Sequence, residues 1–97
     1  LGEVALIGAD SPIHQMDTLF YETLFDENAS CHLALGAGFT NVLPDYAALT
    51  HEQACARGVN DSVHHTDFMI GAPDLSVTGR TRDGVDVCVF RDGNWVI

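Results

Sequence analysis

The sequence has no lysine and only four arginines against fourteen aspartates and glutamates, so its formal net charge at pH 7 is −10. A chain this acidic repels the phosphates of nucleic acids and the surfaces of anionic lipids. No apolar run approaches the roughly 20 residues that span a bilayer, and the N-terminus lacks the residue order of a signal peptide. We therefore expect a cytoplasmic protein with no nucleic-acid partner and no membrane partner.

Cysteine is scarce as well. Cys31, Cys55 and Cys88 are widely spaced and form no C-x-x-C pair. This pattern indicates neither a disulfide framework nor a zinc site built from paired thiolates. Three free thiols suit a reducing compartment.

The short length excludes a second domain. Ninety-seven residues are about two thirds of an average single domain, which leaves room for one core. With 46% hydrophobic and 19% charged residues, the composition is typical of a folding chain. Because the first six residues already resemble a strand with no initiating segment before them, we expect a piece of a longer chain.

The apolar pattern predicts an α+β fold, with a mixed sheet, short helices and a C-terminal β-meander. Thr50 and Gln53 have the T-x-x-Q spacing of a capping box, and Gly58 provides a stop after that helix. The predicted elements are a strand at 4–7, helices at 17–25, 29–35 and 51–57, a strand at 63–70, and meander strands at 75–77, 85–90 and 94–97. The residues expected in the core are Phe20, Phe25, Phe68, Met69 and Trp95.

His65 and Asp67 have the spacing H-x-D within the predicted strand at 63–70. Residues two apart on a strand share a face, so an imidazole and a carboxylate would point to one place, as a divalent metal requires. In a chain with five histidines and ten aspartates, chance alone supplies about half of one such pair. The alternative is a strand histidine that is hydrogen-bonded to a neighbouring carboxylate.

Two glutamates are harder to explain without a positive partner. Glu27 lies five residues before His32, at the junction of two predicted helices, and a buried acid there needs a metal, an arginine or several backbone donors. The alternative is a solvated loop in which Asn28 caps the next helix. Glu3 lies inside an apolar strand, where a carboxylate is costly unless a positive group meets it or the strand edge is exposed.

The remaining histidines and cysteines suggest little chemistry. We expect His14 and His51 to be solvated and His64 to point away from the face of His65. Cys31 precedes His32 directly, and adjacent residues on a helix do not face each other, which argues against a thiol nucleophile.

Taken together, several blocks of sequence resemble the C-terminal region of the thermophilic-type metallo-aminopeptidases, the family of aminopeptidase T and aminopeptidase S. Two blocks are highly specific, L-F-D-E-N-A-S-C-H-L-A-L-G at 24–36 and H-x-D-F-M-I-G at 65–71. Shorter blocks at 1–3, 58–62 and 90–95 follow the same order. The resemblance therefore covers nearly the whole chain and implies that residues 1–97 form the C-terminal part of the catalytic domain.

The resemblance implies a metal-dependent exopeptidase, which hydrolyses the N-terminal residue of peptides through a water activated by two divalent metal ions. The two metal ions would be Zn, Co or Mg/Mn. The substrates would be peptides with a free N-terminus, and the complete protein would be a homodimer. Glu3 and Asp67 are both candidates for the bridging carboxylate. The resemblance implies five metal ligands, which are Glu3, Glu27, His32, His65 and Asp67.

Two departures from the family pattern stand out. The family places a catalytic tyrosine seven residues after the ligand histidine, where this chain has Phe39. Tyr46, nearby in sequence, is a candidate substitute. The family's further upstream glutamate ligand and N-terminal domain are absent from these residues, so we expect an incomplete site and no activity from the piece alone. The alternative function is a non-catalytic relative that keeps the fold and binds metal or serves a structural role.

Overall fold

The computed structural model describes residues 1–97, and the chain divides into two units. The first unit combines Leu1–Ala5 with His32–Phe68, and the second combines Leu6–Cys31 with Met69–Ile97. Each unit therefore draws on segments that are distant in sequence. Each contributes to one small three-stranded sheet.

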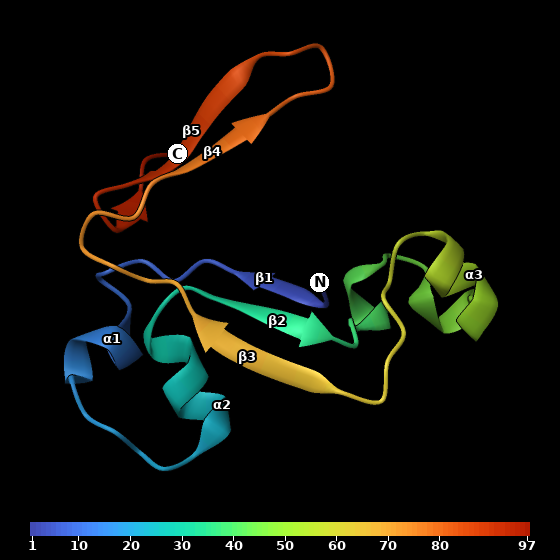
Figure 1. Ribbon diagram of the computed structural model, residues 1–97, viewed down its shortest axis with the longest axis horizontal. Coiled ribbons are helices and arrows are strands. Elements are labelled where there is room, and N and C mark those ends of the chain that lie inside the picture. The colour runs from blue at the N-terminus through green and yellow to red at the C-terminus, as the bar shows by residue number, and fades with distance from the viewer. The chain divides into compact units, whose positions relative to one another are not determined.

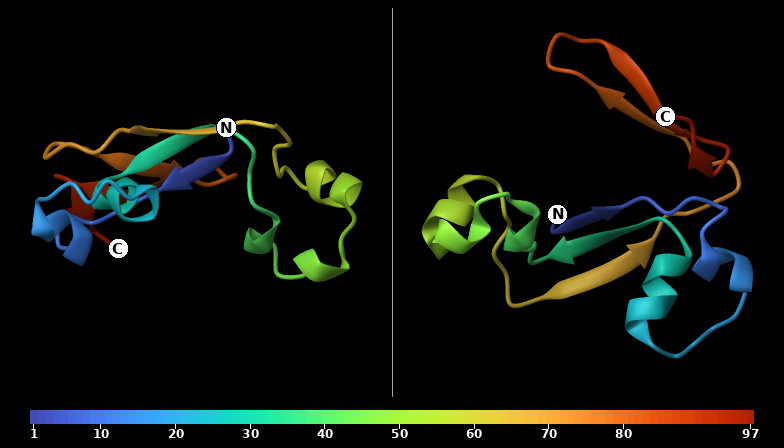
Figure 2. Two further views of the ribbon diagram at one scale, coloured as in Figure 1. Left: turned by 90° about the horizontal axis from the view of Figure 1, so that it is seen from below. Right: turned by 180° about the vertical axis from the view of Figure 1, so that it is seen from behind.

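The sheet of the first unit consists of β1 (Glu3–Ala5), β2 (His32–Gly36) and β3 (His65–Met69), in that order across the sheet. β1 is antiparallel to β2, and β3 lies along the other edge of β2 and runs in the opposite direction to it (Figures 1 and 2). The predictions of an N-terminal strand and of a strand around His65 are confirmed. β2, in the middle, fixes the positions of both neighbours.

The prediction of a helix at 29–35 is wrong, because these residues end one short helix and then enter β2. Ser30 is extended, with φ −155° and ψ 163°. A short apolar run does not distinguish helix from strand, and the decision here comes from pairing with β1, where Val4 lies opposite Leu33. His32 therefore lies on a strand, and its side chain is directed by the pleat of the sheet.

The segment between β2 and β3 contains two 3₁₀ turns, η2 (Thr40–Val42) and η3 (Tyr46–Ala48), followed by α3 (His51–Ala56). Figure 1 shows this segment beyond the end of the sheet where β2 ends and β3 begins. The predicted capping box is present, since Thr50 and Gln53 exchange side-chain and backbone hydrogen bonds. The predicted helix at 51–57 is thus confirmed to within one residue.

The second unit begins with α1 (Pro12–Met16), α2 (Thr23–Asp26) and the 3₁₀ turn η1 (Glu27–Ala29). The prediction of one helix over 17–25 is wrong. Pro12 occupies the first turn of α1, where its missing N–H costs nothing, and Asp17 ends that helix at φ 46°. Glu22 then caps the separate helix α2.

The C-terminal meander is confirmed as β4 (Val77–Arg80), β5 (Asp86–Arg91) and β6 (Asn94–Trp95), paired antiparallel in that order. Asp92, at φ 51°, and Gly93, at φ 74°, form the predicted turn between β5 and β6. The α+β class is confirmed, with two antiparallel sheets in place of the expected mixed sheet. None of the helices could cross a membrane, since the longest has six residues.

Few side chains are fully buried. Phe90 is the largest of them and packs edge-on against Trp95, with ring centroids 5.2 Å apart. The prediction of a core was wrong for Phe25, Phe68, Met69 and Trp95, which are 41–51% exposed, while Phe20 is half-buried. Small sheets of short strands cover little surface, so aromatic residues on them stay in contact with solvent.

Candidate metal centre

One face of the β1–β2–β3 sheet gathers the ionisable side chains of the first unit. His32 and Ala34 share a face of β2 because residues two apart lie on one side of a strand, and His65 and Asp67 share a face of β3 for the same reason. The register places Glu3 directly opposite Ala34. Three strands therefore bring together four of the five predicted ligands.

Glu3 is paired with an imidazole at each of its two carboxylate oxygens. Its Oε1 lies 3.0 Å from Nε2 of His32, and its Oε2 lies 3.4 Å from Nε2 of His65. The His32 side chain is only 2% exposed, whereas that of Glu3 is 27% exposed. Two imidazoles, from β2 and β3, therefore meet the carboxylate for which the sequence predicted either a positive partner or an exposed strand edge.

The orientation of His65 is set by a backbone carbonyl. Its Nδ1 lies 2.7 Å from the carbonyl oxygen of Ala37, and because a carbonyl can only accept, Nδ1 carries the hydrogen. Nε2 then faces Oδ1 of Asp67 at 3.2 Å and Oε2 of Glu3 at 3.4 Å. In the neutral ring Nε2 is an acceptor facing two further acceptors, an arrangement that needs a proton or a cation between them.

The electrostatics of His65 agree with this geometry. The hydrogen bond to Ala37 raises the pKa of His65, partial desolvation opposes that rise, and the carboxylates of Asp67 and Glu3 add to it. The surroundings therefore favour positive charge at this position. A metal cation satisfies the same demand, with the carbonyl of Ala37 fixing the ring as outer partners of metal-binding histidines commonly do.

Asp67 provides an independent test of whether the residues fit a metal. Its Oδ1 is buried and has no hydrogen-bond partner, although the oxygen lies 3.2 Å from Nε2 of His65. A buried carboxylate oxygen without a donor is costly. Glu3, His65 and Asp67 offer three ligand atoms that all lie within 4.8 Å of one another. Oxygen and imidazole donors of this kind suit a divalent cation, so these residues fit a bound metal ion.

Small residues of β2 leave room for this arrangement. Ala34 is fully buried opposite Glu3. Gly36 has φ +108°, and a Cβ there would collide with the carbonyl oxygen of His64. Neither these residues nor Ala37 stood out in the sequence, because they act through their size or their backbone and carry no reactive group.

Phe39, at the position where the family pattern has a tyrosine, contacts the ring of His65, with centroids 5.1 Å apart and planes tilted by 53°. A residue at this position therefore lies against one of the candidate ligands. Tyr46, the candidate substitute, lies on η3 with 48% of its surface exposed. The residue whose ring contacts His65 is therefore Phe39.

Glu27, the fifth predicted ligand, lies on η1 in the second unit and is half-buried. Its role as a ligand stays a prediction from the resemblance. The thiol of Cys31 accepts from the backbone N–H of Ile7 at 3.2 Å, which agrees with the expectation that it is not a nucleophile paired with His32.

Comparison with known proteins agrees with the metal-binding geometry. A family model described as "Thermophilic metalloprotease (M29)" matches residues 1–95. Aminopeptidase 2 of Geobacillus stearothermophilus is 52% identical over 95 residues, and aminopeptidase AmpS of Bacillus subtilis is 48% identical over 95. Each alignment covers 98% of this chain and 23% of the relative.

A solved structure gives the same result. Wild-type AmpT from Thermus thermophilus matches with a TM-score of 0.81 and 41% identity, over 100% of this chain and 23% of that one. The chain thus spans about a quarter of the length of the relatives that it matches.

Proposed function

Because this chain belongs to the family of thermophilic metalloproteases (M29), we propose that it supplies most of the metal ligands of an aminopeptidase, which removes the N-terminal residue of peptides. The observation that carries the proposal is the convergence of two carboxylates and two imidazoles on one face of a sheet. The paired arginines, Arg57 and Arg80, bind other acids. A cation is the partner that this site still requires.

We propose two cations at the centre, with Glu3 or Asp67 as the bridging carboxylate. Each oxygen of Glu3 faces a different imidazole, as expected of a carboxylate that serves two positions. Asp67 likewise offers an oxygen within 4.8 Å of ligand atoms of Glu3 and His65 and, in a second grouping, of His32, which supports the same role for Asp67. Mixed imidazole and carboxylate donors suit Zn²⁺ or Co²⁺ better than Mg²⁺ or Mn²⁺.

Divalent cations bound here would polarise the peptide carbonyl and lower the pKa of a water molecule. The chain's own residues prepare for that chemistry. Ala37 holds the ring of His65 so that Nε2 points to the site, and buried His32 keeps Glu3 in place.

A second candidate function, metal binding without catalysis, is favoured by one observation. Phe39 lies against His65 but has no hydroxyl with which to stabilise a developing charge. If no other group of the complete protein supplies that hydroxyl, the centre binds metal and turns over slowly or not at all. We propose the slow enzyme as the first candidate, because the ligand geometry is otherwise retained.

Metal titration of the complete protein tests the proposal. Zn²⁺ or Co²⁺ should bind the centre with about two equivalents per chain, and His65→Ala should remove at least one of them. His64→Ala is the matched control, since adjacent residues of an extended chain point to opposite sides and we expect His64 to face away from the site. Binding of one equivalent or less at this centre by the unaltered protein would sink the two-cation proposal.

Two further measurements complete the test. Glu27→Gln should lower the stoichiometry or affinity if Glu27 is a ligand, and should leave both unchanged if it only ends the helical segment. Hydrolysis of leucine- or arginine-type aminoacyl substrates by metal-loaded protein separates the enzyme from the non-catalytic relative. We also propose, from the resemblance alone, that the complete protein is a cytoplasmic homodimer, which sedimentation and fractionation would measure.

A further inference from the structure

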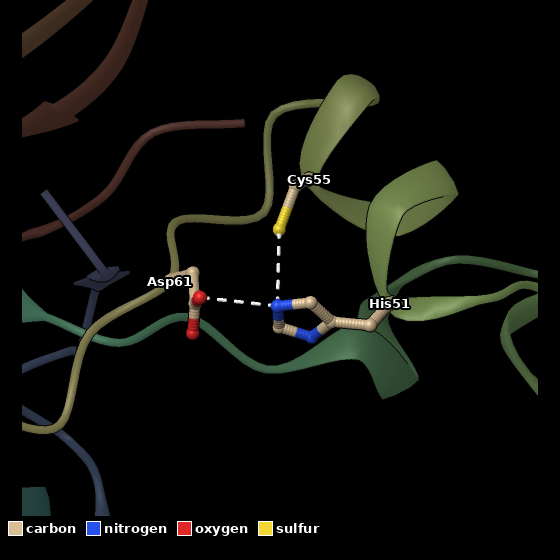
Figure 3. Close-up of side chains that lie close together, drawn as sticks. All are labelled: His51, Cys55 and Asp61. Atoms are coloured by element: carbon tan, nitrogen blue, oxygen red, sulfur yellow. Dashed lines mark hydrogen bonds and ion pairs between the residues drawn. The ribbon is translucent and has the colours of Figure 1, made fainter.

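A second cluster of metal-binding side chains lies in the segment between β2 and β3. His51 and Cys55 are four residues apart on α3, so both lie on one face of the helix, and Asp61 reaches them from the loop that follows (Figure 3). Nε2 of His51 lies 3.0 Å from Oδ2 of Asp61 and 3.8 Å from Sγ of Cys55. None of these residues is a ligand of the sheet centre.

Both contacts involve the same nitrogen of His51, as Figure 3 shows. In a Cys-His-Asp nucleophile relay the carboxylate would instead bind the opposite nitrogen of the ring from the thiol. The sulfur, nitrogen and oxygen atoms here converge on one point, all within 4.8 Å of one another. Convergence of this kind favours a shared cation over a proton relay.

The distances agree with a tetrahedral zinc site. Bonds to zinc of about 2.05 Å for nitrogen, 2.3 Å for sulfur and 2.1 Å for oxygen place N and S about 3.6 Å apart, and N and O about 3.4 Å apart. The observed separations of 3.8 and 3.0 Å differ from these by only a few tenths of an ångström. Small side-chain rotations would therefore complete the site.

We propose that His51, Cys55 and Asp61 bind a zinc-type divalent cation at a site separate from the sheet centre. The thiolate and imidazole select a borderline or soft cation over Mg²⁺ or Ca²⁺. Binding replaces the thiol proton of Cys55, which is released to solvent, by the metal–sulfur bond. With His51 and Asp61 exposed by 68% and 64% at their side chains, the fourth position is open to water or to an outside ligand.

Such a cation would fasten α3 to a loop that is already attached to the sheet. Asn60, next to Asp61, accepts a hydrogen bond from the N–H of Gly38 at 2.8 Å and donates its side-chain amide to the carbonyl of Gly36. Occupancy would thus restrain the path from α3 to the end of β2. Without the cation, the side-chain contact between the helix and this loop is the exposed one between His51 and Asp61, since the thiol of Cys55 contacts only His51 of the same helix.

Cobalt spectroscopy of the complete protein tests this site on its own. A thiolate bound to Co²⁺ gives a charge-transfer band in the near ultraviolet, and the sheet centre, built from carboxylates and imidazoles, gives none. The band should appear as Co²⁺ is added, disappear in Cys55→Ser, and persist in His65→Ala, so failure here and failure of the sheet centre are distinguishable. Cys88→Ser, which alters a thiol of the second unit, is the matched control and should keep the band.

Two outcomes would overturn the proposal: no thiolate band at saturating Co²⁺, or a band that Cys55→Ser leaves intact. His51→Ala should weaken Zn²⁺ binding at this site by at least about tenfold, since even outer partners of ligands are worth that much. A second measurement does not depend on any variant. Zn²⁺ should slow alkylation of Cys55, mapped by mass spectrometry, while that of Cys88 is unaffected, and equal rates with and without Zn²⁺ would count against the site.

Discussion

The two sheets of this chain, each with three antiparallel strands, treat their acidic residues in opposite ways. In the β4–β5–β6 sheet, Asp86 binds Arg80 through both carboxylate oxygens, at 2.7 and 3.2 Å, on adjacent strands. In the β1–β2–β3 sheet, Glu3 and Asp67 face imidazoles. The β4–β5–β6 sheet pairs its carboxylate with its own arginine, and the β1–β2–β3 sheet places its carboxylates against imidazoles, where we propose that a cation from solution binds.

The contrast shows what distinguishes a site from a surface. The Arg80–Asp86 pair is exposed, its two residues are close in sequence, and both carboxylate oxygens have a donor. The proposed ligands of the β1–β2–β3 sheet are partly buried, come from three strands, and include an oxygen with no donor. Long-range convergence with an unsatisfied atom is therefore a stronger indication of function than the number of charged residues.

The largest effect should follow from neutralising Glu3. Glu3→Gln keeps the shape of the side chain but removes the charge between His32 and His65, so we expect metal affinity to fall by more than about 100-fold and turnover by about 1,000-fold or more. Isothermal titration with Zn²⁺ and single-turnover assays of the complete protein would measure both. Glu52→Gln, on the exposed first turn of α3, is the control and should change neither. Normal metal binding by the Glu3 variant would remove the distinction between the two sheets.

A smaller effect is expected at Phe39, beside His65. Phe39→Tyr would add a hydroxyl near the ligands, and a restored donor for the charge that develops in the transition state is worth about 10²- to 10³-fold in kcat, with little change in KM. Steady-state kinetics of the metal-loaded protein would test it. If the unaltered protein is already fast and Tyr46→Phe abolishes the rate, Tyr46 has taken over the role. If both the unaltered protein and Phe39→Tyr are inert while metal binds, the non-catalytic function is correct.

The smallest effects concern pH, and the two sheets should respond with opposite signs. Arg80 lowers the pKa of Asp86 below 3.8, so this pair stabilises the hairpin above that pH and ceases to do so as the pH falls through the lowered value. The pKa of His65 is raised above 6.5, so metal-free protein gains stability from it below that pH and loses this gain as the pH rises through the raised value.

Hydrogen exchange of metal-free protein, resolved by residue, would measure the two responses. Amides of β4 and β5 should exchange faster in acid, and those of β2 and β3 faster above neutrality. Asp86→Asn should remove the first response and leave the second. A common response of both sheets would show that the difference in their charge pairing has no energetic consequence.

Much of the fold could be predicted because the deciding interactions are local. The capping box at Thr50 and the turn at Asp92–Gly93 involve residues within a few positions of each other, and both were placed correctly. β2 was mistaken for a helix because its strand character comes from pairing with β1, about 30 residues away in sequence. A local sequence pattern does not reveal pairing between strands that are distant in sequence.

The same distinction applies to the sites. The H-x-D spacing of His65 and Asp67 could be read directly, and their neighbouring positions on β3 are confirmed. The approach of Glu3 to His32 spans 29 residues and could be expected only from the resemblance. The cluster on α3 was missed although its signal was local, since His51 and Cys55 are four residues apart on a helix that had been predicted correctly.

Ala37 uses both of its backbone groups to hold β3. Its N–H donates to the carbonyl oxygen of His64 at 2.7 Å, and its own carbonyl accepts from Nδ1 of His65 at 2.7 Å. Because neither contact involves the side chain, most substitutions at position 37 would leave the imidazole of His65 aligned. The site should therefore tolerate sequence variation at this position. Proline is the exception, since it lacks the N–H. The orientation of His65 thus depends on the path of the backbone at position 37 more than on which residue stands there.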